Sequence, residues 1–303
     1  MPDLLGIIPH LLGFHPDESL VVVVAEHGHV AVTARADLSQ ASPPGNVEGI
    51  LARLWARFPA ACGWFVAYSH DVEGAWEVLR RCCQALPAES VGAAVVVDGA
   101  LWWQEPGARP SRLKPPESPD AVRAAFPGRA ARMARAELAV SIHGPSGQSL
   151  KAAVAAVAKA EGGLVGVRDT GALMRALLAR DPSTLGDAEC AQLIALADDP
   201  QARDQAIIAP DDESADRLVA LWSRVLRVCP PGHRAQPLAL LGSAAWVAGE
   251  GALVTLCLEE LERGDARVPL ERVLAYLVDQ VVPPSTWPQI REQLVDACAQ
   301  EAA

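Results

Sequence analysis

The chain has 303 residues, half of them hydrophobic, and a formal net charge of -11 at pH 7. This length and composition supply enough apolar side chains for one large or two modest cores. The acidic charge argues against binding to nucleic-acid backbones, because that class of protein needs a basic face that displaces counterions from phosphates. We therefore expect a globular protein without a nucleic-acid partner.

Hydropathy and cysteine usage indicate the compartment. No stretch reaches the roughly 18 apolar residues that a membrane-spanning helix needs, and the N-terminus lacks the layout of a signal peptide. The seven cysteines are odd in number and show no C-x-x-C spacing, which fits reduced thiols better than a disulfide framework or a zinc site. We expect a cytoplasmic protein with no membrane contact, no cofactor and no bound metal. The oligomeric state is not predictable.

Residues 1–104 predict an α/β domain. The run SLVVVVA is continuously apolar and β-branched, as in a strand buried on both faces, and EHGH supplies a turn into a second strand. The expected elements are strands at Ser19–Ala25, His29–Ala36 and Cys62–Ser69, helices at Asn46–Phe58 and Glu73–Leu86, and a hairpin in VGAAVVVDGALWW that turns at Asp98 and Gly99. This alternation is typical of a mixed sheet covered by helices.

Residues 105–127 contain repeated prolines, which favour a linker or a long surface loop, and residues 128–303 predict only helices. The helices are expected at Arg129–Ile142, Ser149–Ala160, Thr170–Arg180, Asp187–Ala197, Glu213–Val228, Pro237–Ala248, Ala252–Arg263, Leu270–Gln280 and Trp287–Ala299. Short breaks between them predict antiparallel hairpins in an all-α helical bundle.

Four stretches resemble the actinobacterial family catalogued as domain of unknown function 4192: PHLLGFHPDESLVVV, TARADL, RDQA and PLALLGSAAWVAGEGALVTLCLEELERGD. The resemblance covers nearly the whole chain. Members of that family often carry a CCP segment after the tryptophan strand, but LWWQEPGARP has none here, so no metal or redox role transfers from it. The resemblance implies no activity.

The stretch AAWVAGEGALVTLCLEELERGD is also similar to one tetratricopeptide hairpin, with a tryptophan, a glycine between helices and small residues where the helices approach. A repeat array needs about three such units to bury its faces. We therefore expect a helical bundle with one tetratricopeptide-like corner, which points to a protein partner bound through the helical half.

Two motifs with possible cofactor or metal chemistry are better explained by structure. GEGALV lacks the third glycine of a dinucleotide fingerprint and follows a helix rather than a strand. His27 and His29 offer two metal ligands, but a site needs a third, and a solvated hairpin tip explains both.

The candidate site comes from strand directions. If the first hairpin turns about His27 and Gly28, Leu20 lies opposite Arg35 and Glu18 lies opposite Asp37. A right-handed crossover to the third strand makes the second and third strands parallel, so their carboxyl ends share an edge, where open α/β sheets bind ligands. The candidate ligand-binding residues are His15, Asp17, Arg35, Asp37, Tyr68, Ser69, His70 and Asp71. Catalytic residues are not predictable.

A structural role for the same charges remains open, because Arg35 can simply pair with Asp17, Glu18 or Asp37. Ser69, His70 and Asp71 are consecutive and cannot by themselves form a catalytic relay. Two hypotheses follow. The leading one is a non-enzymatic interaction or regulatory protein whose helical half binds a partner. The alternative is a small-molecule-binding protein or hydrolase that works at the sheet edge. A closed, charged pocket at that edge would favour the alternative.

Overall fold

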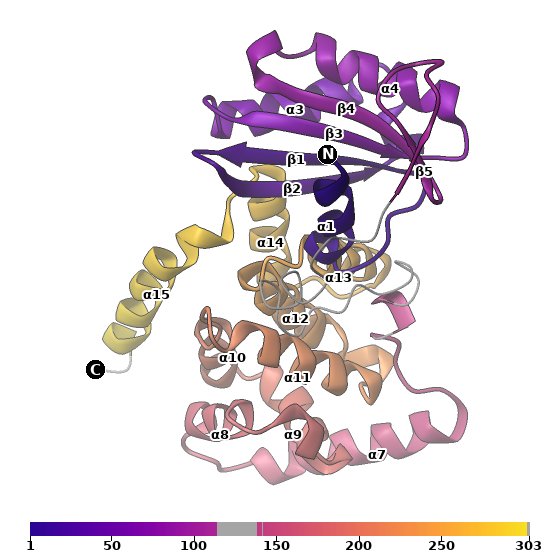
Figure 1. Cartoon of the computed structure of the whole chain (residues 1–303). Coiled ribbons are helices and arrows are strands. Elements are labelled where there is room, and N and C mark those ends of the chain that lie inside the picture. Colours follow the sequence, from indigo (N-terminus) through magenta and orange to yellow (C-terminus); the bar gives the residue numbers. More distant parts are fainter. Residues whose placement is uncertain (114–137, 141, 302–303) are drawn as a thin grey trace. The chain divides into compact units, whose positions relative to one another are not determined.

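The computed structural model describes residues 1–113, 138–140 and 142–301 (Figure 1). The chain divides into two compact units, Met1–Arg135 and Ala136–Ala303. The first unit contains a mixed β-sheet with helices, and the described part of the second unit contains helices. The predicted fold class, an α/β sheet region followed by a helical region, is confirmed.

The sheet of the first unit has six strands in the order β2-β1-β3-β4-β5-β6. In chain order they are β1 (Ser19–Glu26), β2 (His29–Asp37), β3 (Cys62–Tyr68), β4 (Val91–Asp98), β5 (Leu101–Trp103) and β6 (Ser111–Arg112). Strand β1 is antiparallel to β2 and β3, and β3 is parallel to β4. Strands β2, β3 and β4 therefore run the same way, and their carboxyl ends lie at one edge with the start of β1. We call this the carboxyl edge.

The register of the first hairpin differs from the prediction by one residue. The sequence predicted Leu20 opposite Arg35 and Glu18 opposite Asp37, whereas Asp37 pairs with Ser19. Because side chains alternate between the faces of a sheet, this shift puts Ser19, Arg35 and Asp37 on the same face.

A β-bulge in the hairpin causes the shift. Val24 pairs with Val32, but Ala25 pairs with Val30, so Ala31 is an extra residue in β2. A bulge of this kind has no clear signature in a run of small and β-branched residues. The sequence therefore predicted the hairpin and its turn but not the register beyond the bulge.

Helices cover both faces of the sheet in the first unit (Figure 1). Helices α3 (Asn46–Arg57) and α4 (Val72–Gln84) lie on one face, and α1 (Pro2–Leu12) lies on the other. Trp55 of α3 stacks on Phe65 of β3 with the ring centroids 6.3 Å apart. The ring centroid of Phe14, just after α1, lies 5.9 Å from the guanidinium carbon of Arg35. The short helix α2 (Leu38–Ala41) follows β2 directly, and the 3₁₀ turn η1 (Ala88–Ser90) precedes β4.

The sequence did not predict α1. The helix begins at Pro2 and contains Pro9, which has no N–H for the helical ladder and lowers helix propensity. It nevertheless buries Leu5, Ile8 and Leu12, which lie on one stripe at helical spacing. Packing of this stripe outweighs the cost of the internal proline.

The described part of the second unit consists of helices joined by short connections. They are α7 (Gly147–Leu164), α8 (Thr170–Leu178), α9 (Asp187–Ala197), α10 (Pro200–Ile208), α11 (Ala215–Arg227), α12 (Ala235–Val247), α13 (Gly251–Arg263), α14 (Pro269–Asp279) and α15 (Trp287–Glu301), with 3₁₀ turns η2 (Pro182–Thr184), η3 (Pro231–His233) and η4 (Pro284–Thr286). The sequence predicted all of these α-helices except α10. That helix buries only Ala202 and Ala206, so its sequence carries little apolar periodicity.

Helices α12 and α13 form the hairpin that the sequence likened to a tetratricopeptide unit. A Cβ atom on Gly242 of α12 would lie 2.9 Å from Leu274 Cδ1 and 3.4 Å from Cys257 Cβ, so glycine permits the close approach of α13 and α14. Trp246 packs edge-on against Trp287, with ring centroids 6.1 Å apart. Among the described helices, none combines the length and the apolarity needed to cross a bilayer.

Most of the predicted linker at residues 105–127 lies outside the described residues. Residues 105–113 are described and belong to the first unit, where Ser111–Arg112 forms β6 beside β5. The helix predicted at Arg129–Ile142 also lies largely outside the described residues. The linker therefore stays a prediction.

Candidate functional site

The carboxyl edge brings together acidic and histidine side chains from three segments of the first unit. Asp17 and Glu18 directly precede β1, His70 lies between β3 and α4, and Asp98 is the last residue of β4. We call these four residues the edge cluster. They meet because β3 and β4 are parallel and β1 starts where both of them end.

Glu18 is the best-anchored member of the edge cluster. Ser69 Oγ lies 3.2 and 3.0 Å from its two carboxylate oxygens and donates to them, and the backbone N–H of His70 donates at 2.9 Å. The backbone N–H of Leu38 donates to the Glu18 carbonyl at 2.9 Å. These bonds hold Glu18 at a φ of 40°, a left-handed conformation that costs a non-glycine residue on the order of 1 kcal/mol.

The imidazole of His70 is oriented by a carboxylate. Its Nδ1 lies 2.7 Å from Asp98 Oδ1, and its Nε2 lies 3.9 Å from Asp17 Oδ1. The hydrogen bond to Asp98 and then the charge of Asp98 raise the pKa of His70 above its ordinary value, and the charges of Asp17 and Glu18 add to this. The ring therefore points Nε2 towards the other two acids while Asp98 holds Nδ1.

The geometry of the edge cluster suits a divalent cation. Asp17, Glu18 and His70 each offer one ligand atom, these atoms lie within 4.8 Å of one another, and all three residues are exposed. Two carboxylates and one imidazole are a mixed oxygen and nitrogen donor set, as used for Mn²⁺, Zn²⁺ and Fe²⁺. Three protein ligands leave coordination positions for water or a ligand.

Arg35 and Asp37 form a separate ion pair rather than joining the edge cluster. Arg35 Nη2 donates to Asp37 Oδ1 at 2.5 Å, and Arg35 Nε donates to Ser19 Oγ at 2.9 Å. The Arg35 side chain is only 14% exposed. The bond to Ser19 ties β2 to β1, and the pair with Asp37 within β2 is one of the ion-pair alternatives that the sequence left open for Arg35.

Three further predicted site residues, Asp71, Tyr68 and His15, also do not join the edge cluster. Asp71 accepts a hydrogen bond from the N–H of Gly74 at 3.0 Å and so caps α4. Tyr68 carries a phenol oxygen that bonds to no described residue, and burial raises its pKa. His15 is exposed and makes no hydrogen bond or ion pair with the described part of the chain. The structure thus brings Asp17, Ser69 and His70 together and leaves the other predicted residues in different roles.

The sequence missed two members of the edge cluster as site residues: Glu18, which it considered only as an ion-pair partner for Arg35, and Asp98, which it assigned to a turn. The turn itself lies one residue later, since Asp98 pairs with Leu101 across Gly99 and Ala100. The signal was present: the connection from β3 through α4 makes β4 parallel to β3, so an aspartate that ends β4 belongs at the carboxyl edge. The expectation of no metal depended on ligand spacing along the chain, whereas these ligand atoms converge from separate segments.

The fold defines a class of protein in which an α/β sheet unit precedes a helical unit, with acidic and histidine side chains at the carboxyl edge. The chain belongs to the family described as domain of unknown function (DUF4192), whose family model matches residues 2–285. The family suggested by the four sequence stretches is thereby confirmed. No curated protein and no solved structure gives a significant match to the chain.

Proposed function

We propose that the α/β unit binds a divalent metal ion at the carboxyl edge and uses the open coordination positions to bind a small molecule. The observation that carries the proposal is the convergence of Asp17, Glu18 and His70, with ligand atoms within 4.8 Å of one another. The proposal belongs to the small-molecule-binding alternative of the sequence analysis. It adds a metal, against the expectation from the sequence that no metal is bound.

Asp98 supports this function through His70. Histidines that bind metals commonly bond a carboxylate through the other ring nitrogen, which fixes the ring and its tautomer, and loss of such a partner typically costs about 10- to 100-fold in metal affinity. Asp98 lies 2.7 Å from His70 Nδ1, which leaves Nε2 for the ion. Since Asp98 also raises the pKa of His70, a proton competes with the metal, and metal affinity should increase as the pH rises through that pKa.

The test is titration of the full-length protein with Mn²⁺ and with Zn²⁺, followed by electron paramagnetic resonance for Mn²⁺ and by calorimetry for both. His70→Ala and Asp17→Asn should each weaken binding at least about tenfold, because each removes one of three ligands. Asp98→Asn should weaken binding and shift its pH profile to lower pH, because the pKa of His70 falls.

The matched control is His27→Ala. His27 lies at the tip of the first hairpin, 4.0 Å from Glu26, so it is also an exposed histidine beside a carboxylate, but the described residues provide no third ligand there. Binding should be unchanged in this variant. Equal loss of Mn²⁺ affinity in His27→Ala and His70→Ala, or no loss in His70→Ala, would contradict the proposal.

The second candidate function is binding of a protein partner by the helical unit in the cytoplasm. It is supported by α14, which buries only Leu274 and exposes Val273, Tyr276 and Val278 by 51%, 62% and 41%. The tetratricopeptide likeness of α12 and α13 points the same way. The seven cysteines, odd in number and without C-x-x-C spacing, fit the reduced thiols of a reducing compartment.

Cross-linking in the native host tests the partner. A partner held by α14 should lose its cross-links in Tyr276→Asp but keep them in Val154→Asp, which changes a 51% exposed valine on α7. Cross-links that persist in Tyr276→Asp would exclude α14 as the contact surface.

A further inference from the structure

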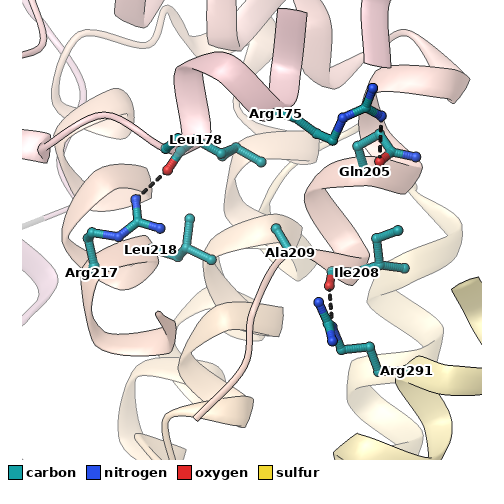
Figure 2. Close-up of a pocket in the computed structure, with 9 residues that line it drawn as sticks. Arg175, Leu178, Gln205, Ile208, Ala209, Arg217, Leu218 and Arg291 are labelled. Carbon is teal, nitrogen blue, oxygen red and sulfur yellow. Dashed lines mark hydrogen bonds between the residues drawn. The ribbon is translucent and has the colours of Figure 1, made fainter. Parts of the chain in front are cut away.

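The helical unit contains a cavity that the sequence did not indicate (Figure 2). Its volume is about 320 Å³, which lies at the small end of the range for ligand-binding pockets. The lining comes from α8, α10, α11 and α15 and from residues just after α8 and α10. The residues are Arg175, Leu178, Ala179, Gln205, Ile208, Ala209, Arg217, Leu218 and Arg291.

The polar part of the lining consists of three arginines and one glutamine. Arg175 Nη1 donates to Gln205 Oε1 at 2.9 Å, and Arg291 Nε donates to the carbonyl of Ile208 at 2.7 Å (Figure 2). Arg217 Nη1 donates to the carbonyl of Leu178. Each of these bonds uses one guanidinium nitrogen, so the other nitrogens of each arginine keep donors for a ligand.

No described carboxylate lies within ion-pair distance of these arginines, unlike Arg180, Arg224 and Arg263 in the same unit, which pair with acids at 3.4 Å or closer. Two of the cavity arginines donate to carbonyls at helix C-termini, and each terminus carries roughly half a negative charge. The three guanidinium groups therefore exceed the partial negative charge of these two termini, in a chain whose net charge is -11.

The neighbouring aspartates are engaged by their own turns. Ser183 donates to Asp181 at 2.7 Å, and Ser214 donates to Asp211 at 2.6 Å. The hydrogen bonds from these serines are the main reason that the pKa of each aspartate is lowered, and the charges of Arg217 and Arg291 contribute least. The two acids therefore reduce the positive potential without pairing with the arginines.

We propose that this cavity binds a small organic anion. Its phosphate or carboxylate group would meet the free guanidinium donors of Arg175, Arg217 and Arg291, which suit planar, bidentate recognition of such oxyanions. A short apolar body would contact Ile208 and Ala209, the half-exposed apolar residues of the lining. The site lies within the helical unit and goes beyond the proposed metal site, so either can fail without the other.

Calorimetric titration of the full-length protein tests the site with phenyl phosphate, hexanoate and inorganic phosphate as probes. Phenyl phosphate should bind at least tenfold more tightly than inorganic phosphate, because only the former reaches the apolar lining. Tighter binding of phenyl phosphate than of hexanoate would assign the site to phosphorylated ligands, and the reverse would assign it to carboxylates. Arg175→Gln and Arg291→Gln should each reduce the affinity for the tighter-binding probe at least tenfold.

Arg175 is exposed, and among the described residues it bonds only to the side chain of Gln205, so Arg175→Gln tests binding without disturbing the fold. The matched control is Arg263→Gln, which removes one positive charge from an arginine paired with Glu259 and Glu260 on α13. It should change affinity less than twofold. Equal loss in Arg263→Gln and Arg175→Gln, or binding of an acidic peptide without binding of any small probe, would overturn the proposal.

Discussion

The two units of the chain gather charges of opposite sign in different ways. The α/β unit brings Asp17, Glu18 and Asp98 to a sheet edge, where they remain exposed or half-exposed around His70. The helical unit lines a cavity with Arg175, Arg217 and Arg291. Clustered acids are expected on a chain with a net charge of -11, whereas three arginines around a cavity with no described carboxylate partner are not. The comparison shows that a charge cluster is informative mainly when it runs against the charge of its surroundings.

The largest expected losses of stability come from substitutions in the hydrophobic cores of the two units. Phe65 of the sheet and Trp222 of α11 are 0% and 1% exposed, so Phe65→Ala and Trp222→Ala should each reduce the free energy of unfolding by about 3 to 5 kcal/mol. If the units unfold separately, differential scanning calorimetry should show that each variant shifts only one transition. A common shift of all transitions in both variants would mean that the two units unfold as one.

Arg35→Ala tests whether Arg35 stabilises the fold or belongs to the proposed metal site. Arg35 is mostly buried but Asp37 is 41% exposed, so the loss of stability should lie between that of an exposed and a buried pair, at about 1 to 3 kcal/mol. Mn²⁺ affinity should stay unchanged. Arg80→Ala, which breaks the exposed pair with Glu77, should leave the stability unchanged in the same urea titration. A large loss of Mn²⁺ affinity in Arg35→Ala would instead place Arg35 in the site.

Removal of a helix cap should cost less stability, and the loss should be equal in the two units. Asp71 caps α4 through Gly74 at 3.0 Å, and Asp169 caps α8 through Ala172 at 2.7 Å. Asp71→Ala and Asp169→Ala should each cost about 1 kcal/mol in urea unfolding, and the asparagine variants should keep most of the stability, because asparagine also caps. A cost for Asp71→Ala far above that for Asp169→Ala would indicate that Asp71 also supports the edge cluster.

The smallest effect concerns the pH dependence of stability. Because the folded pKa of His70 is raised, mainly by the hydrogen bond to Asp98, its contribution is fully present below the unfolded pKa of about 6.5. The contribution is lost as the pH rises through the raised pKa. The melting temperature of His70→Gln should therefore fall below that of the native protein near pH 6, and the two should converge at alkaline pH. A difference in melting temperature between the two proteins that increases with pH would contradict a raised pKa for His70.

Much of the α/β unit was predictable from local sequence patterns. The β-branched run of β1, the alternation of strands and helices, and the handedness of crossovers gave the common direction of β2 and β3. The same rule extends to β4 and would have added Asp98 to the candidates. The register of β2 was wrong by one residue, because the bulge at Ala31 depends on pairing between strands. Helix α1 was missed because its internal proline conceals a stripe that only packing stabilises.

The sequence by itself determined the α/β and helical character of the two halves, the family, and the edge at which Asp17 and His70 meet. Periodicity, β-branching and strand direction act over short stretches of chain, so they can be read without coordinates. Only the tertiary structure decided that Arg35 pairs with Asp37, that Asp98 orients His70, and that Arg175, Arg217 and Arg291 surround one cavity. Those arrangements depend on register and on helix packing, which bring together side chains far apart in the chain.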